Sequence, residues 1–226
     1  MSRNAELKKI VAEVGEDLIW RPLYDSEKKF LAGGIGKEID GLDPEFKELD
    51  FKGKTVCDLG CNMGYFSFYA WEKGAREVVG YDLEPKVVAG AKKLAELYCA
   101  DNVDFCICDF AKEEPDRTFD MGMLIDIIGK TGIGNGWLDS MLRGLEKRSE
   151  SEMLLTFRPV YIVNRHLNLT TEELLQIYHK ATVEDDVFNL LDYVIEFYAE
   201  NWEMTYISKE HPEKKYYKNT VHFKRK

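Results

Sequence analysis

The sequence lacks several features that would assign it to common classes of protein. It contains no apolar run long enough to span a membrane, and its first residues lack the apolar segment of a secretory signal peptide. Its five cysteines form no C-x-x-C pair, and its four histidines do not combine with cysteines and carboxylates at the spacing of a metal site. We therefore expect a cytoplasmic protein with reduced thiols, no metal ion and no membrane contact.

Positive charge is also scarce. The chain carries 31 Lys and Arg against 41 Asp and Glu, a net charge of −10, which disfavours long-range attraction to a polyanion. The basic tail from Lys209 to Lys226 is the exception. We interpret it as a polar hairpin loop and a charged edge strand rather than as an RNA-binding patch. Nucleic acid is therefore not the first expectation for a partner.

The most informative stretch is a strand followed by a glycine turn and a helix. Residues 55–60 form a mostly apolar strand that contains the lone carboxylate Asp58, and Gly60 and Gly64 bracket a turn in which backbone N–H groups can approach a ligand. The largely apolar stretch 65–71 predicts a helix packed on a sheet. The dinucleotide fingerprint G-x-G-x-x-G does not fit this glycine spacing. The pattern predicts a nucleotide-like ligand at the turn.

A second acidic residue follows at the distance expected for binding a ribose. About twenty residues after the turn, the strand 77–82 ends in Asp82, whose carboxylate can accept both hydroxyls of a nucleoside. The alternative is an ordinary αβ repeat in which Asp82 only caps the next helix. The third strand, 103–108, is followed by Asp109 and Phe110.

These residues resemble the motifs of the class I S-adenosylmethionine (SAM) dependent methyltransferases. The family's first motif is D/E-x-G-x-G-x-G, and here it stands as Asp58-Leu-Gly60-Cys-Asn62-Met-Gly64, with Asn62 at the middle glycine. Asn tolerates positive φ better than other non-glycine residues. The resemblance covers roughly residues 50 to 226 and implies that SAM is the cofactor.

The resemblance also implies which residues bind SAM. Asp58 and the glycine turn would hold its methionine portion, Asp82 its ribose, and Asp109 with Phe110 its adenine. The expected cofactor-binding residues are Asp58, Gly60, Cys61, Asn62, Gly64, Tyr65, Asp82, Leu83, Asp109, Phe110 and Ile125.

The order of predicted elements specifies an α/β fold. Alternating strands and helices from residue 54 onward predict a doubly wound, mostly parallel sheet with helices on both faces. Segments 202–207 and 219–224 read as a hairpin, which in the resembled family closes a seven-stranded sheet with an antiparallel last strand. We expect a single domain over residues 1–226, made of an N-terminal helical cover segment, 1–49, and a Rossmann-like core, 50–226.

Several details of these elements are predicted as well. The amphipathic spacing of residues 4–15 predicts a helix capped by Asn4. The strand before residue 158 should run over 152–157, and the pattern of 187–198 is typical of an amphipathic helix. Glycines make the segment 129–136 permissive and mobile. Three histidines are expected to be exposed to solvent, namely His179, His211 and His222.

Groups that contact the acceptor should follow the fourth and fifth strands, where open α/β sheets build specificity. Asp126 ends the fourth strand and His166 lies beyond the fifth, so both are candidate catalytic residues, although a structural role suits Asp126 equally well. The [DNS]-P-P-[YFW] sequence common in enzymes that methylate exocyclic amino groups is missing. Residues 20–37, which mix aromatic residues with glycines, either fold over the cofactor pocket or form a surface turn.

We therefore predict a SAM-dependent methyltransferase that acts on a small molecule, with oxygen favoured over nitrogen as the acceptor atom. Two other functions stay open. One is an RNA-modifying methyltransferase, for example on tRNA, that uses the basic tail. The other is a SAM-binding or interaction protein without catalytic activity. The sequence predicts neither the acceptor nor the oligomeric state.

Overall fold

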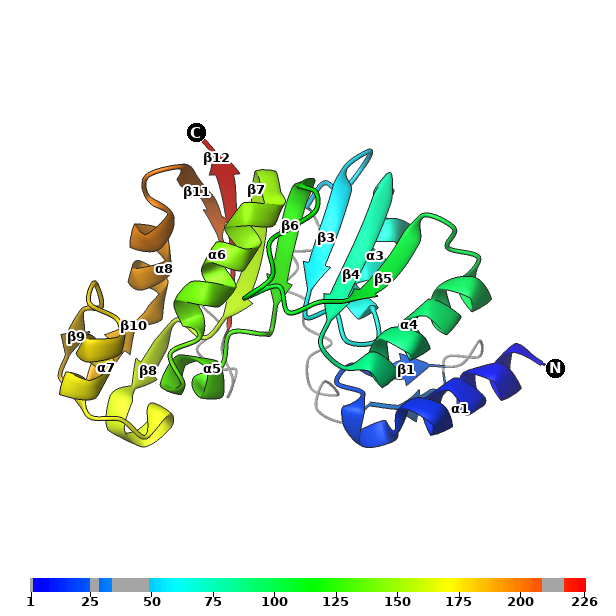
Figure 1. The fold of residues 1–226 in the computed structure, drawn as a ribbon, viewed down its shortest axis with the longest axis horizontal. Helices are drawn as coiled ribbons and strands as arrows, with labels where there is room; N and C mark the ends of the chain where they lie inside the picture. The colour runs from blue at the N-terminus through cyan, green and yellow to red at the C-terminus, as the bar shows by residue number, and fades with distance from the viewer. Residues whose placement is uncertain (1, 25–28, 34–48, 209–217) are drawn as a thin grey trace. The chain divides into compact units, whose positions relative to one another are not determined.

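A computed structural model describes residues 2–24, 29–33, 49–208 and 218–226. The chain divides into two compact units, Met1–Phe110 and Ala111–Lys226. Seven strands form one mostly parallel sheet (Figure 1). The α/β fold class predicted from the sequence is thereby confirmed, whereas the single domain stays a prediction.

The first unit supplies three parallel strands of this sheet. Strand β4 pairs in parallel with β3 on one side and with β5 on the other, so the carboxyl ends of the three strands lie at one edge. Its elements are α1 (Arg3–Val14), the 3-10 helix η1 (Glu16–Leu18), β1 (Leu23–Tyr24), β2 (Phe30–Ala32), β3 (Thr55–Leu59), α3 (Tyr65–Glu72), β4 (Glu77–Asp82), α4 (Pro85–Tyr98) and β5 (Val103–Ile107).

Helix α1 lies beside α4 (Figure 1). The residues that it buries are Leu7, Ile10, Val11 and Val14, the spacing of an amphipathic helix. The two helices approach closely because α4 carries Gly90 at the contact, where a Cβ would overlap the Val14 side chain of α1. The predicted cap is wrong: Ser2, not Asn4, accepts the first free N–H, that of Ala5 at 3.3 Å.

The second unit supplies the other four strands and a small sheet of its own. Strands β6 and β7 are parallel, and β12 runs antiparallel to both β7 and β11, which confirms the antiparallel last strand. Its elements are β6 (Phe119–Ile125), α5 (Lys130–Gly134), α6 (Leu138–Arg148), β7 (Ser149–Phe157), β8 (Val160–Ile162), the π-helix η2 (Val163–Leu167), α7 (Thr171–Ile177), β9 (Val183–Glu184), β10 (Val187–Asn189), α8 (Leu190–Tyr198), β11 (Trp202–Ile207) and β12 (Asn219–Arg225).

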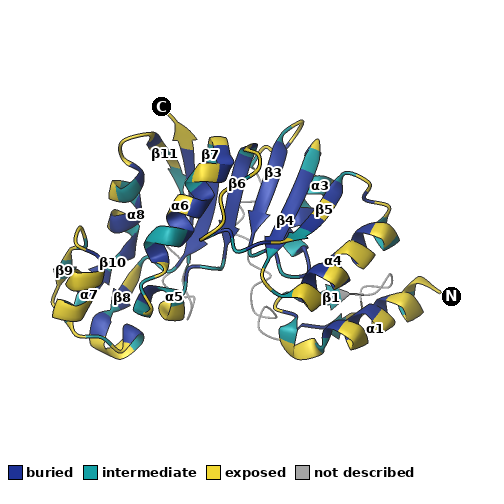
Figure 2. Ribbon diagram, viewed as in Figure 1, coloured by how far each residue is buried: buried dark blue, intermediate teal, exposed yellow. Residues whose placement is uncertain are grey.

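The core of each unit is centred on its strands. All five residues of β3 are buried, as are the last five residues of β7, because parallel strands covered by helices have no solvent-facing side. Figure 2 shows these strands as buried and the outward sides of the helices as exposed.

Three predictions about the second unit differ from the structure. The glycine segment 129–136 contains helix α5, which is held in place because Ile133 is fully buried and its carbonyl accepts the Tyr178 hydroxyl at 2.7 Å. Strand β7 starts at residue 149, three residues earlier than predicted. The pattern 187–198 is split between β10 and α8, since Asn189 ends the strand and caps the helix by accepting the N–H of Asp192.

The histidine predictions have mixed outcomes. His179 is exposed, as predicted. The prediction for His222 is wrong: its ring is buried between strands, and Nε2 lies 2.8 Å from the Glu152 carboxylate. His211 lies outside the described residues, as does most of the basic tail.

Candidate functional site

The turn that follows β3 is shaped by two glycines in the left-handed region. Gly60 and Gly64 have φ angles of 74° and 80°, where a side chain is disfavoured. The N–H groups of Gly60 and Cys61 both donate to the carbonyl of Tyr81, at 2.8 and 3.0 Å. A Cβ on Gly64 would overlap the Phe105 ring, with Cε1 at 2.7 Å. The turn 60–64, named here the cofactor turn, is therefore fixed against both β4 and β5.

Asp82 connects the cofactor turn to the end of β4. One carboxylate oxygen accepts the N–H of Asn62 at 2.8 Å, and the other accepts the N–H of Glu84 at 3.0 Å. Each carboxylate oxygen has two lone pairs, so both oxygens can accept a further hydrogen bond from a ribose hydroxyl. Sequence reasoning predicted the ribose contact but missed that Asp82 also shapes the turn.

Apolar surface for a flat ring lies next to this carboxylate. Leu83 is 61% exposed although it directly follows a buried strand, and Ile107, which pairs with Asp82 across the sheet, is 58% exposed. Asp109 is half-buried and Phe110 is buried just beyond β5. Two exposed apolar side chains beside an acid are what an adenosine needs, because its ring stacks on apolar groups and its ribose binds to oxygen acceptors.

Asp58 is enclosed rather than open to solvent. Its side chain is 1% exposed and accepts a hydrogen bond of 2.7 Å from the Ser67 hydroxyl on α3. Burial, reinforced by the nearby charge of Asp82 and opposed by the Ser67 hydrogen bond, raises the pKa of Asp58 to about 7. Asp58 therefore ties β3 to α3, and its contact with the methionine portion of SAM stays a prediction.

Asn62 binds the cofactor turn to the segment that precedes the sheet. Its backbone has a φ of 48°. Its amide nitrogen donates to the carbonyl of Leu18 at 2.8 Å, and its amide oxygen accepts the N–H of Trp20 at 3.1 Å. The only signal for this contact in the sequence was a side chain with a donor and an acceptor at a position that is glycine in the resembled motif.

Arg21 extends this contact onto helix α3. Its guanidinium carbon lies 4.9 Å from the centre of the Phe66 ring and 5.8 Å from that of Tyr65. Residues 18–21 thus contact the cofactor turn and the first turn of α3. The predicted cover, residues 20–37, falls partly on 25–28 and 34–37, which lie outside the described residues.

In the second unit, Asp126 follows β6 in a left-handed conformation with a φ of 62°. Its Oδ1 accepts hydrogen bonds from the Thr156 hydroxyl at 3.0 Å and from the Lys218 ammonium at 2.6 Å, while its N–H donates to the same hydroxyl. Ile125, just before it, is buried. A non-glycine residue held at positive φ is costly and is concentrated at functional sites. Lys218 is a partner that sequence reasoning missed.

His166 lies in the π-helix η2. Its Nδ1 accepts the N–H of Ile162 at 2.8 Å, so the neutral ring carries its proton on Nε2. The pKa of His166 is lowered by burial and then by the charges of Arg158, Arg165 and Lys130. The ring therefore presents an N–H donor rather than a basic nitrogen on its Nε2 side.

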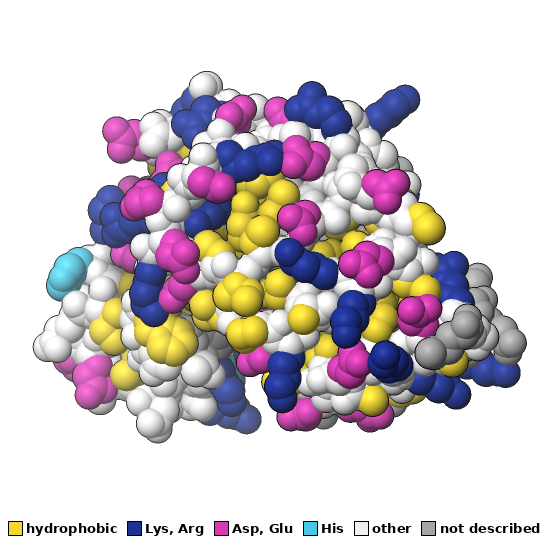
Figure 3. Space-filling view, turned by 45° about the vertical axis from the view of Figure 1, so that its right-hand side comes forward, with side chains coloured by type: hydrophobic (Ala, Val, Ile, Leu, Met, Phe, Trp, Pro, Cys, Tyr) yellow, Lys and Arg dark blue, Asp and Glu magenta, His cyan; other side chains and the backbone are white. Residues whose placement is uncertain are grey.

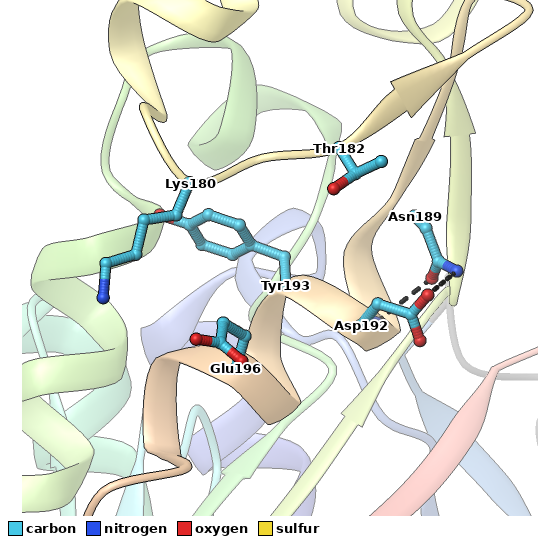
Figure 4. Close-up of a pocket in the computed structure, with 6 residues that line it drawn as sticks. All are labelled: Lys180, Thr182, Asn189, Asp192, Tyr193 and Glu196. Atoms are coloured by element: carbon cyan, nitrogen blue, oxygen red, sulfur yellow. Dashed lines mark hydrogen bonds between the residues drawn. The ribbon is translucent and has the colours of Figure 1, made fainter.

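The second unit also contains a hollow of about 510 Å³ that is separate from the predicted site residues (Figure 4). None of the predicted site residues lines it, and its polar groups largely serve the fold: Asn189 and Asp192 bond to each other at the start of α8, and the Tyr193 hydroxyl donates to Asp139 at 2.7 Å. The residues that line it are Lys180, Thr182, Asn189, Asp192, Tyr193 and Glu196. Among the described residues, no group of three His, Cys, Asp or Glu side chains is placed to hold a metal ion.

Relatives with assigned names match parts of the chain. A ribosomal protein L11 methyltransferase from Vibrio vulnificus (strain CMCP6) is 30% identical over 104 residues, which cover 45% of this chain and 32% of that protein. The nodulation protein NoeA of Rhizobium meliloti is 45% identical over 40 residues, which cover 18% of this chain and 8% of that protein. The chain thus spans a third or less of the length of these curated relatives.

Solved structures resemble most of the chain at low sequence identity. PH0226 from Pyrococcus horikoshii OT3 has a TM-score of 0.57 at 20% identity, covering 84% of this chain and 90% of that one. Magnesium protoporphyrin IX methyltransferase from Synechocystis PCC 6803, solved with bound S-adenosylhomocysteine (SAH), has a TM-score of 0.55 at 20% identity, covering 78% and 76%. In the described part of the chain, no helix is both long and apolar enough to cross a membrane.

The family itself is shown by a match over more than half of the chain. A family model described as a methyltransferase domain matches residues 50–181, which include the cofactor turn, Asp82, Asp126 and His166. The family predicted from the sequence motifs is confirmed, and with it SAM as the cofactor. The chain belongs to the methyltransferase domain family and has the fold of class I SAM-dependent methyltransferases.

Proposed function

We propose that the chain transfers a methyl group from SAM to a small molecule. The observation that carries this proposal is the arrangement at the carboxyl ends of β3 and β4, where the Asp82 carboxylate, the cofactor turn and the exposed Leu83 meet. These groups suit an adenosine that bears an amino-acid portion, because they offer carboxylate oxygens as acceptors, a turn without side chains at Gly60 and Gly64, and an exposed apolar side chain. SAM supplies an electrophilic methyl group on a positively charged sulfur.

The proposed binding roles follow the geometry. Asp82 accepts the ribose hydroxyls while it keeps the N–H of Asn62, and Leu83, Asp109 and Phe110 surround the adenine. Gly60, Cys61, Gly64 and Tyr65 supply the turn and the start of α3 beside the methionine portion. Methyl transfer is an in-line displacement, so alignment of the acceptor and exclusion of water supply most of the catalysis.

We propose a hydroxyl oxygen as the acceptor atom and Asp126 as the group that removes its proton. Of the two predicted catalytic residues, His166 presents an N–H on Nε2, whereas Asp126 carries a carboxylate at the carboxyl end of β6. The net charge of −10 and the missing amino-methylation sequence favour a small molecule with an oxygen acceptor. Figure 3 shows positive and negative side chains interspersed over one face, which suits a small ligand better than a polyanion.

The first test is calorimetry with SAM. Asp82→Ala should weaken SAM binding by roughly 1.5 to 3 kcal/mol, about tenfold or more, because a charge-assisted contact with the ribose is lost. Asp101→Ala, which removes an exposed carboxylate from the same unit, serves as the control and should leave the affinity unchanged. A folded Asp82→Ala protein with unchanged affinity would sink the ribose assignment.

The second test follows a labelled methyl group from SAM into fractionated cell extract. We expect the label in the small-molecule fraction. Label in the tRNA fraction, together with tRNA binding that weakens steeply with salt, would favour the RNA alternative. Label in ribosomal protein would favour a protein acceptor, the class of acceptor for which the Vibrio relative is named. Tight SAM binding with no transfer to any fraction would favour the SAM-binding protein without activity.

A further inference from the structure

Four nitrogen-bearing side chains gather beyond the carboxyl ends of β6 and β7. Lys130 begins α5, which follows β6; Arg158 directly follows β7; Arg165 and His166 lie in η2. Helix α5 packs against η2, since a Cβ on Gly134 would lie 3.2 Å from the carbonyl oxygen of Leu167. We name Lys130, Arg158, Arg165 and His166 the basic cluster. It stands where open α/β sheets bind their ligands.

The cluster is held together through an aromatic ring. The guanidinium carbon of Arg158 lies 5.4 Å from the centre of the Tyr161 ring, and His166 meets the same ring edge-on at 6.2 Å. Because the N–H of Ile162 fixes Nδ1 of His166, the direction of Nε2 is set by the backbone. The π-helical turn that carries it is a rare conformation that occurs frequently at functional sites.

Among the described residues, no carboxylate pairs with Lys130, Arg158 or Arg165, although the chain has 41 acidic against 31 basic side chains. Elsewhere in the second unit such pairs do form, as between Arg143 and Asp139 at 3.4 Å. The charges also reach the histidine, because Arg158, Arg165 and Lys130 all lower the pKa of His166 after the larger effect of burial.

From this juxtaposition we infer that the basic cluster binds a carboxylate or phosphate group of the acceptor. The guanidinium of Arg158 and Nε2–H of His166 donate hydrogen bonds to the anion, and Lys130 and Arg165 add charge at the rim. That the anion belongs to the acceptor rests on the proposed function. The acceptor is therefore a hydroxylated small molecule that carries a negative charge, and His166 is a binding residue rather than a base.

The test is an NMR titration of the full chain labelled with ¹⁵N in its four histidines, with inorganic phosphate as the probe and chloride holding the ionic strength constant. The ring signals of His166, assigned with His166→Gln, should shift and saturate. Arg158→Gln should weaken this binding at least tenfold, whereas Arg143→Gln, which removes an arginine from the same unit outside the cluster, should not change it. No shift, a shift shared equally by His179, or one unchanged in Arg158→Gln overturns the inference.

Two further measurements distinguish this inference from the proposed function and from binding of RNA. SAH binding by calorimetry should be unchanged in Arg158→Gln; if the wild-type chain fails to bind SAH while phosphate still saturates His166, the proposed function fails and the anion site stands. Titration with tRNA identifies the source of the anion. Binding of tRNA that is far tighter than that of phosphate, falls steeply with salt and is lost in Arg158→Gln would replace the small molecule by RNA phosphates.

Discussion

The two units differ in whether the polar groups beyond their strand ends have partners within the described part of the protein. In the first unit, the groups at the strand ends already bind one another: Asp82 accepts the N–H of Asn62, Asp58 accepts the Ser67 hydroxyl, and Asn62 bonds to Leu18 and Trp20. In the second unit, the basic cluster has no carboxylate partner among the described residues. The first unit is thus preorganised for one ligand, whereas the second exposes charge that a ligand must satisfy.

The largest effect should come from crowding the preorganised turn. Gly64→Ala puts a Cβ into the Phe105 ring at a positive φ of 80°, so strain of roughly 1 to 2 kcal/mol adds to overpacking of roughly 1 to 3 kcal/mol. In urea unfolding, the backbone strain and the overpacking should together lower the free energy of unfolding.

Gly53→Ala is the matched control for this prediction. Gly53 has a similar φ of 74°, but nothing lies within 4 Å of a Cβ built there, so only the strain should remain. Equal losses in the free energy of unfolding of the two variants would mean that the cofactor turn adjusts to the new side chain. The first unit would then be less preorganised than we infer.

A smaller effect is expected in the second unit, on catalysis rather than on stability. Asp126→Asn keeps an oxygen for Thr156 and Lys218 and tolerates the φ of 62°, but it removes the proposed base. The kcat for an identified acceptor should fall roughly a hundredfold, about 2.7 kcal/mol.

Lys218→Met sharpens this prediction, because it removes the ammonium partner and leaves the carboxylate. Because the proposed base and its hydrogen bond from the Thr156 hydroxyl are kept, the kcat of Lys218→Met, measured with the same acceptor, should fall far less than that of Asp126→Asn. A full rate in Asp126→Asn would assign Asp126 to the fold alone.

The buried carboxylate of the first unit makes stability depend on pH. The pKa of Asp58 is raised to about 7 from the ordinary 3.8, so the folded state binds its proton more tightly than the unfolded state does. The stabilisation of the folded state by this bound proton is complete below pH 3.8, and it is lost as pH rises through the folded-state pKa of about 7. Between pH 5 and 7 the wild type should lose roughly 2.5 kcal/mol relative to Asp58→Asn, measured by urea unfolding at several pH values. The same pH slope in both proteins would show that Asp58 does not hold its proton.

The sequence predicted the first unit better than the second for a physical reason. Gly60 and Gly64 are required by positive φ within one short turn, and Asp82 accepts the N–H of Asn62 in that turn, so short spacing carries the information. The conformation of 187–198 instead depends on tertiary contacts: Asn189 ends a strand that pairs with β8 and caps α8 at the same time. A periodicity of apolar residues does not distinguish these two roles.

The same reasoning explains the histidines and the missed partners. His222 was predicted to be exposed because it lies in an alternating strand, but β12 is flanked by β7 and β11, and its Glu152 partner is 70 residues away. The pairing of Lys218 with Asp126 spans 92 residues. Contacts at such separations leave no local pattern, whereas the contact of Asn62 with Trp20 had at least one signal, an amide at a glycine position.

The smallest expected effect tests that contact. Asn62→Gly restores the glycine of the resembled motif and removes the bonds to Leu18 and Trp20. The two lost bonds, roughly 1 kcal/mol each, are largely offset by relief of the strain at φ 48°, so global stability should change little.

The Trp20 amide, however, loses its acceptor and should exchange with deuterium about tenfold faster. Asn102→Ala, which loses two bonds to the carbonyls of Ala75 and Arg76, should leave that amide unaffected. Saturating SAH should slow exchange at Trp20 in the wild type and not in Asn62→Gly, because the Asn62 side chain connects the cofactor turn to Leu18 and Trp20. Unchanged exchange at Trp20 in Asn62→Gly would show that residues 18–21 are held by Arg21 and the buried Ile19 alone.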